Sequence, residues 1–213
     1  PELERWEHAR RALAAQAPDL SFLYAAELDG ILHRDGPGSL AAQACRTRLA
    51  GDIERARDLL ARHGEVTTLL VGDHGMAEVE RVIDPRPFAP PDGVRHFVDS
   101  TMIRYWGDAS ALAACRAALE RGRLPGRWID HQGLVDRRAP TAGSRYGDAL
   151  FLLDEGGIFA PSFLGGAVRG MHGYDLDAHS CSAALASDHP LPDEVTGLED
   201  VARLVRAPLG LLS

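Results

Sequence analysis

Apolar and polar positions in the N-terminal part of the chain predict two helices separated by a short strand. Residues 2–17 are rich in Ala, Leu, Arg and Glu at helical spacing, which predicts an amphipathic helix that ends before the next proline. Residues 19–26 form an apolar run of strand length, and the polar, glycine-containing stretch 27–39 then predicts a loop or a broken turn. Ser39 is placed to cap a long helix that continues to about Arg62.

Further along the chain, residues 65–72 are continuously apolar and β-branched, which is typical of a strand buried on both faces. Strand, helix and strand in this order predict a right-handed parallel crossover and therefore a mostly parallel sheet flanked by helices, an α/β fold. Residues 148–156 predict another strand. Residues 197–212 predict a terminal helix that breaks near Pro208.

The segment 85–142 has a different pattern from its surroundings. A proline-rich connection is followed by a β-rich run at 97–106 and an alanine-rich helix at 109–122. We therefore expect a small inserted α+β subdomain here, between two parts of one α/β core, 1–84 and 143–213.

Composition narrows the class of protein. The 213 residues are 45% hydrophobic and 25% charged, as in ordinary globular proteins. The 23 basic and 31 acidic residues give a net charge of -8 without any basic run, which argues against a nucleic-acid partner. The negative net charge is compatible with a small anionic substrate, because bound divalent cations can make the local field of an acidic pocket positive. No apolar run approaches the roughly 18 residues of a membrane span.

The three cysteines, Cys45, Cys115 and Cys181, are widely spaced and odd in number. They argue against a disulfide framework and a thiolate zinc site, and they favour a reducing, cytoplasmic compartment. Because Pro1 is not preceded by a methionine, we expect the true N-terminus, with any targeting segment, to lie elsewhere.

Candidate metal chemistry begins with Asp29 and His33, which follow the predicted strand 19–26. Ligands in open α/β sheets bind beyond the strand ends. If the segment is helical, the four-residue spacing lets the carboxylate and the imidazole converge, and this pair suits zinc, manganese or iron. Taken alone, the motif also fits Asp29 and Asp35 as loop-capping carboxylates and His33 as an exposed histidine.

Two further motifs contain the same residue types. Asp73 and His74 follow the strand 65–72 between two glycines, which permit a bend that turns both side chains to one point. His172 is also flanked by glycines, and Asp175 could orient its second ring nitrogen. Each motif alone also fits an ordinary turn or loop.

Taken together and in this order, Asp-x-x-x-His, Asp-His-Gly-Met and His-Gly-Tyr-Asp resemble the alkaline phosphatase superfamily. The closest branch is that of the type I phosphodiesterases and nucleotide pyrophosphatases. The run from Arg145 to Asp148 before an apolar strand, and the run from Asp154 to Gly156 after it, are similar to that branch too. The resemblance covers nearly the whole chain and implies an alkaline phosphatase-like α/β fold.

The resemblance also implies a ligand set. One divalent metal would be held by Asp29, His33 and His172, and a second by Asp73 and His74 together with an Asp and a Thr or Ser nucleophile from the N-terminal part of the fold. Imidazole and carboxylate ligands suit zinc first and manganese second. Two metals about 4 Å apart stabilise the attacking and leaving oxygens of an in-line displacement. The implied activity is hydrolysis of a phosphodiester or nucleotide pyrophosphate bond in a small phosphorylated substrate.

The chain departs from this family at its start, because only the helix 2–17 precedes the first motif and the nucleophile is missing. Ser100, Thr101 and Ser180 are poor substitutes, since none follows a glycine-rich turn or pairs with a suitably placed base. We expect this chain to bind metal but to be inactive alone, as a fragment of a longer enzyme. A second chain carrying the N-terminal half, a non-catalytic metal-binding domain, and a phosphonate or sulfate ester hydrolase remain as alternatives.

Several aromatic residues and histidines could contact a substrate. Trp106, Trp128 and Tyr105 could line a pocket, although aromatic residues in a β-rich run usually belong to the core. His96 and His131 could contact a leaving group or simply be exposed.

Overall fold

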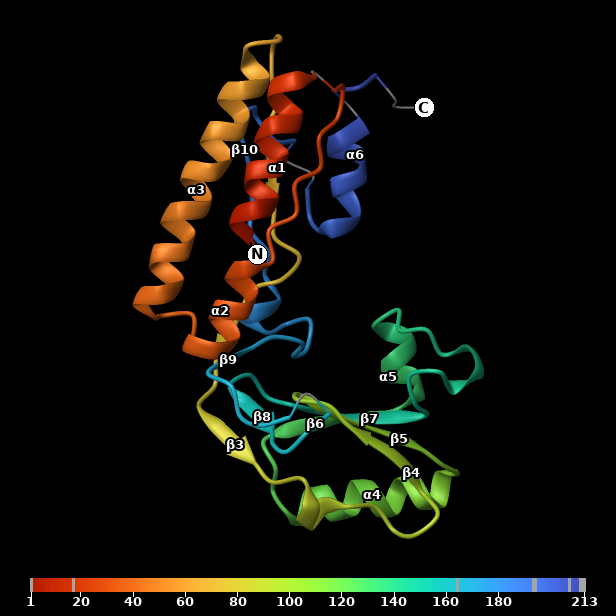
Figure 1. Ribbon diagram of the computed structural model, residues 1–213. Coiled ribbons are helices and arrows are strands. Elements are labelled where there is room, and N and C mark those ends of the chain that lie inside the picture. Colours follow the sequence, from red (N-terminus) through yellow and green to blue (C-terminus); the bar gives the residue numbers. More distant parts are fainter. Residues whose placement is uncertain (1, 17, 164, 193–194, 207, 211–213) are drawn as a thin grey trace. The chain divides into compact units, whose positions relative to one another are not determined.

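The computed structural model describes residues 2–16, 18–163, 165–192, 195–206 and 208–210. The chain divides into two compact units. The first unit contains residues 1–31, 38–75 and 183–213, and the second contains residues 32–37 and 76–182. Figure 1 shows the elements of both.

In the first unit, helix α1 (Glu2–Ala15) packs against helix α3 (Leu40–Ala61). Trp6, Leu13 and Ala56 form the buried centre of this contact. The Ser39 hydroxyl accepts a hydrogen bond from the Ala42 amide at 3.1 Å, so α3 begins at the predicted cap. Both predicted helices are confirmed, except that residue 17 lies outside the described part of the chain.

The predicted strand at 19–26 is wrong, since these residues are neither helical nor part of a sheet. Phe22 is 83% exposed and Tyr24 is 71% exposed. An apolar run indicates β propensity, but a strand also needs a hydrogen-bonded neighbour, and this stretch has none among the described residues.

Helix α2 (Glu27–Asp35) forms where a loop was expected. Glu27 and Asp29 lie in its first turn, and His33 and Arg34 lie in its last. This placement of acidic and basic side chains matches the helix dipole and stabilises α2. The glycine within the helix had argued for a loop, but glycine only weakens a helix by about 1 kcal/mol.

Strand β1 (Leu69–Val71) pairs with β10 (Leu185–Ser187) in an antiparallel ladder. Leu70 is 44% exposed, which corrects the expectation of a strand buried on both faces. The C-terminal segment forms the 3-10 helix η4 (Leu198–Asp200), helix α6 (Val201–Arg206) and a turn at 208–210. The helix therefore ends near Pro208 as predicted, while residues 207 and 211–212 of the expected helix lie outside the described residues.

The second unit is built on a four-stranded antiparallel sheet in the order β4-β5-β7-β6. The strands are β4 (Arg95–Val98), β5 (Met102–Trp106), β6 (Gly126–Ile129) and β7 (Ala149–Leu153). The predicted β-rich run is thus a hairpin, and the predicted strand at 148–156 is confirmed. Helix α4 (Ala109–Arg121), capped by Asp108, confirms the predicted helix at 109–122.

Both faces of this sheet are covered around its centre. On one face, Tyr105 and Phe151 pack with Cys115 and Leu119 of α4, which runs along the sheet in Figure 1. On the other, Leu134 of helix α5 (His131–Asp136) packs on β6 and β7. Strand β7 is buried at every residue, so this strand has the continuously apolar character that was expected of 65–72.

Short strand pairs complete the second unit. Strand β2 (Ala77–Glu78) is antiparallel to β9 (Gly170–Met171), and β3 (Arg81–Ile83) is parallel to β8 (Gly157–Phe159). Three 3-10 helices also lie in the second unit: η1 (Arg86–Phe88) between β3 and β4, η2 (Ala142–Ser144) between α5 and β7, and η3 (His179–Cys181) after β9.

Among the described residues β3 and β8 are the one parallel pair, so the expected mostly parallel sheet is not seen there. An apolar pattern marks strands but does not fix the direction of their partners. The four-stranded sheet joins β7 to strands from 85–142, and the division of the chain at 84 and 142 stays a prediction. Within the described residues, no helix combines the length and apolar character of a membrane span.

Candidate metal centre

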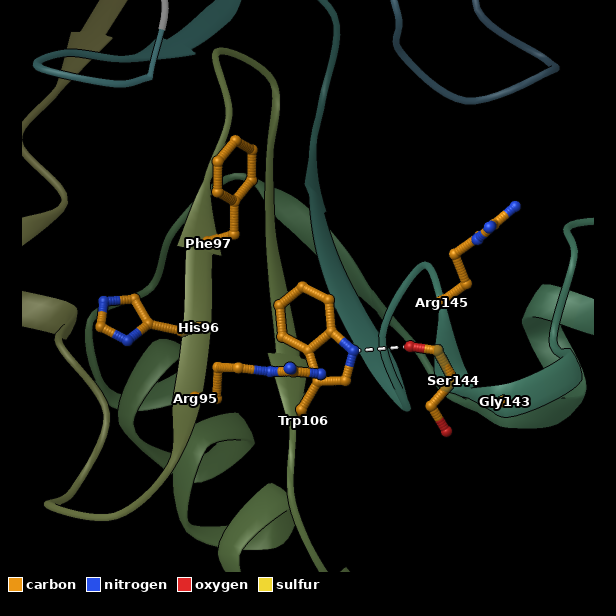
Figure 2. Close-up of a pocket in the computed structure, with 7 residues that line it drawn as sticks. All are labelled: Arg95, His96, Phe97, Trp106, Gly143, Ser144 and Arg145. Carbon is orange, nitrogen blue, oxygen red and sulfur yellow. Dashed lines mark hydrogen bonds between the residues drawn. The ribbon is translucent and has the colours of Figure 1, made fainter.

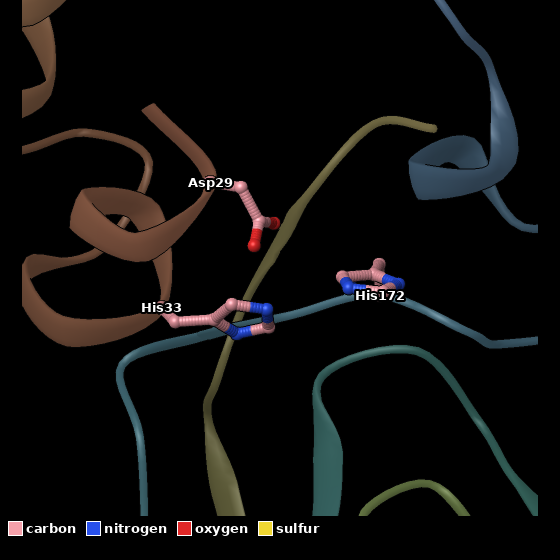
Figure 3. Close-up of side chains that lie close together, drawn as sticks. All are labelled: Asp29, His33 and His172. Atoms are coloured by element: carbon pink, nitrogen blue, oxygen red, sulfur yellow. The ribbon is translucent and has the colours of Figure 1, made fainter. Parts of the chain in front are cut away.

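Helix α2 brings the first two predicted ligands to one face. Asp29 and His33 are four residues apart on this continuous helix, so their side chains are neighbours one turn apart. One ligand atom each from Asp29, His33 and His172 lie within 4.8 Å of one another. Figure 3 shows Asp29 and His33 extending from α2 toward His172. The condition set by the sequence, that the segment be helical, is met.

Strand β9 determines how the two histidines meet. Nδ1 of His33 donates to the Gly170 carbonyl at 2.8 Å, and the Arg169 amide donates to the His33 carbonyl at 2.8 Å. The ring centroids of His33 and His172 are 5.1 Å apart. Because a carbonyl oxygen only accepts, Nδ1 carries the proton and Nε2 of His33 is the nitrogen that can coordinate a metal.

Glycine is required at position 170 for this contact. A Cβ there would lie 2.4 Å from the Leu32 carbonyl oxygen, so any larger residue would force the end of α2 away from β9. Gly173, on the other side of His172, has a φ of +85°, which L side chains rarely adopt. Gly170 therefore allows β9 to approach the end of α2 closely, and Gly173 allows the chain to turn after His172.

Two positioning groups were missed by sequence reasoning. The Gly170 carbonyl orients His33, and the Thr101 hydroxyl donates to the Gly173 carbonyl at 2.7 Å, holding the segment after His172. Neither contact leaves a signal in the sequence, because each joins residues far apart in the chain.

The expected role of Asp175 beside His172 is corrected by the structure. Its carboxylate accepts hydrogen bonds from Arg137 at 2.9 and 2.6 Å and pairs with Arg127 at 2.9 Å. The Arg137 hydrogen bonds hold the pKa of this buried carboxyl below its usual value. Asp175 thus anchors the chain three residues after His172 instead of orienting its ring.

Asp73 and His74 lie directly after β1. Nδ1 of His74 donates to the Gly75 carbonyl at 2.9 Å, and its Nε2 lies 3.7 Å from Oδ1 of Asp73. Because the Gly75 carbonyl only accepts, Nδ1 carries a proton, and Nε2 is the nitrogen of His74 that could coordinate a metal. Gly72 permits the close approach of this turn to Ala184, whose amide nitrogen would be 3.2 Å from an added Cβ.

The hydroxyls considered as nucleophiles are buried. Ser100, Thr101 and Ser180 are 5%, 3% and 3% exposed. Thr101 is bonded to Gly173, and the Ser100 hydroxyl shares a hydrogen bond with that of Ser162 at 3.3 Å. That none of the three is a nucleophile stays a prediction.

The chemistry of the cluster fits a divalent metal. One carboxylate and two imidazoles are a common ligand set for zinc, and they also accept manganese or iron. The Asp29, His33 and His172 side chains are partly buried, so their positions are defined by packing while solvent can still reach the cluster.

A family model described as type I phosphodiesterase / nucleotide pyrophosphatase matches residues 2–175. The chain belongs to this family. The match includes all five predicted metal ligands, and it confirms the resemblance that the motifs indicated. A search of curated proteins gave no match.

Solved structures of this family share the fold. Murine ectonucleotide pyrophosphatase/phosphodiesterase 5 aligns with a TM-score of 0.72 and 19% identity over 89% of this chain and 52% of that structure. An inactive variant of the murine protein in complex with AMP aligns with a TM-score of 0.71 and 19% identity, over 88% of this chain and 52% of that structure. The human protein aligns with a TM-score of 0.71 and 16% identity, over 88% of this chain and 52% of that structure. The fold is therefore alkaline phosphatase-like and α/β, and the chain spans about half the length of these structures.

Proposed function

We propose that this chain carries the metal ligands of a hydrolase that cleaves phosphodiester or nucleotide pyrophosphate bonds in small phosphorylated substrates. Membership of the type I phosphodiesterase family supports this activity. The observation that carries the proposal is the convergence of Asp29, His33 and His172, with one ligand atom each within 4.8 Å.

In this proposal, Asp29, His33 and His172 hold one divalent ion, and Asp73 and His74 contribute to a second. Zinc is the first candidate and manganese the second, because imidazole and carboxylate ligands favour both. When bound, such ions neutralise charge on a phosphoryl group and polarise it.

Three groups of the chain would orient the ligands and favour a bound cation. The Gly170 carbonyl accepts from Nδ1 of His33, which leaves Nε2 as the ring nitrogen that would hold the metal. The Asp29 carboxylate supplies negative charge that favours a cation over a bound anion. The hydrogen bond from Thr101 to Gly173 limits the freedom of the segment that carries His172.

We further propose that a Thr or Ser nucleophile comes from the part of the fold that the chain does not span. The chain covers 52% of the solved relatives, and its own candidate hydroxyls are buried. One of those relatives is an inactive variant in complex with AMP, which supports a nucleotide as the substrate class.

Metal binding is tested by calorimetric titration of the chain with zinc. His33→Ala and His172→Ala should each lose binding at one position, with affinity falling at least tenfold. His63→Ala, an exposed histidine next to the end of α3, is the matched control and should bind as the wild type does. Wild-type affinity in both cluster variants would contradict the assignment.

Activity is tested in the protein that combines this chain with the rest of the fold, using bis(p-nitrophenyl) phosphate. His74→Ala should lower turnover by orders of magnitude while leaving the circular dichroism spectrum unchanged. If the metal-loaded protein hydrolyses no phosphate, phosphonate or sulfate ester, the enzyme proposal fails and a non-catalytic metal-binding domain takes its place. Faster turnover of a phosphonate or sulfate ester would reassign the substrate.

A further inference from the structure

A cavity of about 500 Å³ lies in the second unit, on the sheet of β4, β5, β7 and β6. It is bounded by Arg95 and Phe97 of β4, by Trp106 of β5 and by the turn at 143–145 (Figure 2). Its volume falls within the range of about 300–1,000 Å³ that is usual for small-molecule pockets.

Strand pairing places arginine and aromatic side chains together on this face. Arg95 is the direct partner of Trp106, and Phe97 is the direct partner of Arg104, so all four side chains share one face of the hairpin. The opposite face of β5 is buried in the core with α4. Alternate side chains of β5 therefore point to opposite faces: Ile103 and Tyr105 lie in the core, and Arg104 and Trp106 lie on the charged, aromatic face.

The walls of the cavity hold one another in place. The Arg95 guanidinium lies 4.3 Å from the centroid of the Trp106 ring, and Figure 2 shows it laid across the indole. The Trp106 indole N–H donates to the Ser144 carbonyl at 2.6 Å, which ties β5 to the turn. Ser144 in turn donates its hydroxyl to Asp148. Arg145 extends from this turn at the exposed rim of the cavity.

The charges at the cavity are not balanced by carboxylates. Arg104 pairs with Asp99 at 3.7 Å, and Asp148 accepts from Ser144 and from the Gly107 amide at 3.1 Å. Among the described residues, neither Arg95 nor Arg145 has a carboxylate partner. A chain with a net charge of -8 therefore presents two such guanidinium groups at one cavity.

We propose that this cavity binds a phosphate-bearing small molecule with a planar group, independently of the metal cluster. A guanidinium stacked on an indole keeps its N–H edges available for two parallel hydrogen bonds to an oxyanion. A phosphate has enough oxygens to engage Arg95 and, from the rim, Arg145, and the planar group lies against Phe97, beside the indole that Arg95 covers.

The test follows the tryptophan indole N–H resonances of the chain while AMP is added in the presence of EDTA. The sequence has three tryptophans, so Trp106→Phe assigns the reporter and the resonances of Trp6 and Trp128 serve as internal controls. The Trp106 resonance should shift saturably, since its N–H borders the cavity. Arg95→Ala and Arg145→Ala should each weaken AMP binding by about tenfold or more.

Two control variants separate this site from general charge effects and from the metal cluster. Arg116→Ala removes an exposed arginine of α4 that pairs with Glu120, and it should bind AMP as the wild type does. His33→Ala should also retain AMP binding. Loss of binding in His33→Ala, or a strict need for metal, would place AMP at the metal cluster and overturn the inference while leaving the proposed function intact.

Two further ligands test the two halves of the recognition. Adenosine should bind much more weakly than AMP, and equal affinity would overturn the role of the arginines. Inorganic phosphate should also bind more weakly, and equal affinity would overturn the role of the aromatic residues. No shift of the Trp106 resonance at millimolar AMP would overturn the proposal as a whole, whatever the outcome of the hydrolysis assay.

Discussion

Replacement of Gly170 by alanine tests whether the close contact between β9 and the end of α2 builds the metal cluster. The added Cβ would lie 2.4 Å from the Leu32 carbonyl oxygen and 3.2 Å from Cγ of Met76. Non-bonded heavy atoms need about 3.5 Å, so backbone must move by about 1 Å. Relaxation by a side-chain rotation is not available, because the nearest atom belongs to the main chain.

The expected cost combines crowding with two lost hydrogen bonds. Overpacking of a close contact costs about 1–3 kcal/mol. The bonds from His33 Nδ1 to the Gly170 carbonyl and from the Arg169 amide to the His33 carbonyl, each 2.8 Å long, contribute about 0.5–1.5 kcal/mol apiece. Gly170→Ala should therefore destabilise the second unit by about 2–6 kcal/mol.

Hydrogen exchange in increasing urea, read by mass spectrometry on peptides from 76–182, measures this loss, and a zinc titration measures its effect on the cluster. Zinc affinity should fall together with stability, because His33 loses the group that fixes its tautomer. Gly166→Ala is the matched control, since an added Cβ there meets nothing within 4 Å. If Gly170→Ala unfolds at the same urea concentration and binds zinc as tightly as wild type, the proposed geometry of the cluster is refuted.

Four further outcomes are expected. Ser39→Ala should lower the free energy of unfolding of the first unit by about 1 kcal/mol, because α3 loses its capping hydroxyl, and an unchanged urea midpoint would contradict the cap. Gly30→Ala should raise that free energy by about 0.5–1 kcal/mol, since this position is helical and open; a loss of stability would show that the glycine is needed. Arg137→Ala should cost about 1–3 kcal/mol at neutral pH by leaving the buried Asp175 carboxylate with Arg127 as its remaining cation. Pairing with Arg137 lowers the pKa of Asp175, so the stability that this pair contributes is complete above the ordinary carboxyl pKa of about 3.9. It is lost as pH falls through the lowered pKa. The unfolding free energies of the wild type and the variant, measured by urea unfolding, should therefore converge in acid. Burial raises the pKa of Tyr174 to about 12, so stability should fall as pH rises above the phenol's ordinary value of about 10; Tyr174→Phe should reduce that fall, as followed by urea unfolding at increasing pH.

The helices and the central strand of the second unit were predictable because their pattern is local. The apolar spacing of α1, α3 and α4 reflects one buried face, and Ser39 and Asp108 mark two of their starts. Strand β7 is apolar at every position because helices cover it on both sides. In each case the signal lies within one segment, although the elements that cover the buried face lie elsewhere in the chain.

The remaining errors concern partners that lie elsewhere in the chain. The stretch 19–26 has the composition of a strand, yet no described neighbour pairs with it. Strand β1 finds its partner in β10, more than a hundred residues away, and the direction of β10 makes the pair antiparallel. Periodicity determines which residues favour a strand, whereas the neighbour determines whether the strand forms and in which direction.

The metal cluster combines both kinds of information. Asp29 and His33 are brought together by the local geometry of α2, so their spacing predicted their convergence once the segment is helical. The meeting of His33 with His172 depends instead on Gly170, which lets β9 approach α2, and on Gly173, whose φ of +85° turns the chain after His172. Alanine at either glycine would leave every metal ligand in the sequence but disturb the backbone that orients two of them. Ligand residue types alone therefore do not identify this candidate site, because the glycines beside His172 are part of what brings its ring to His33.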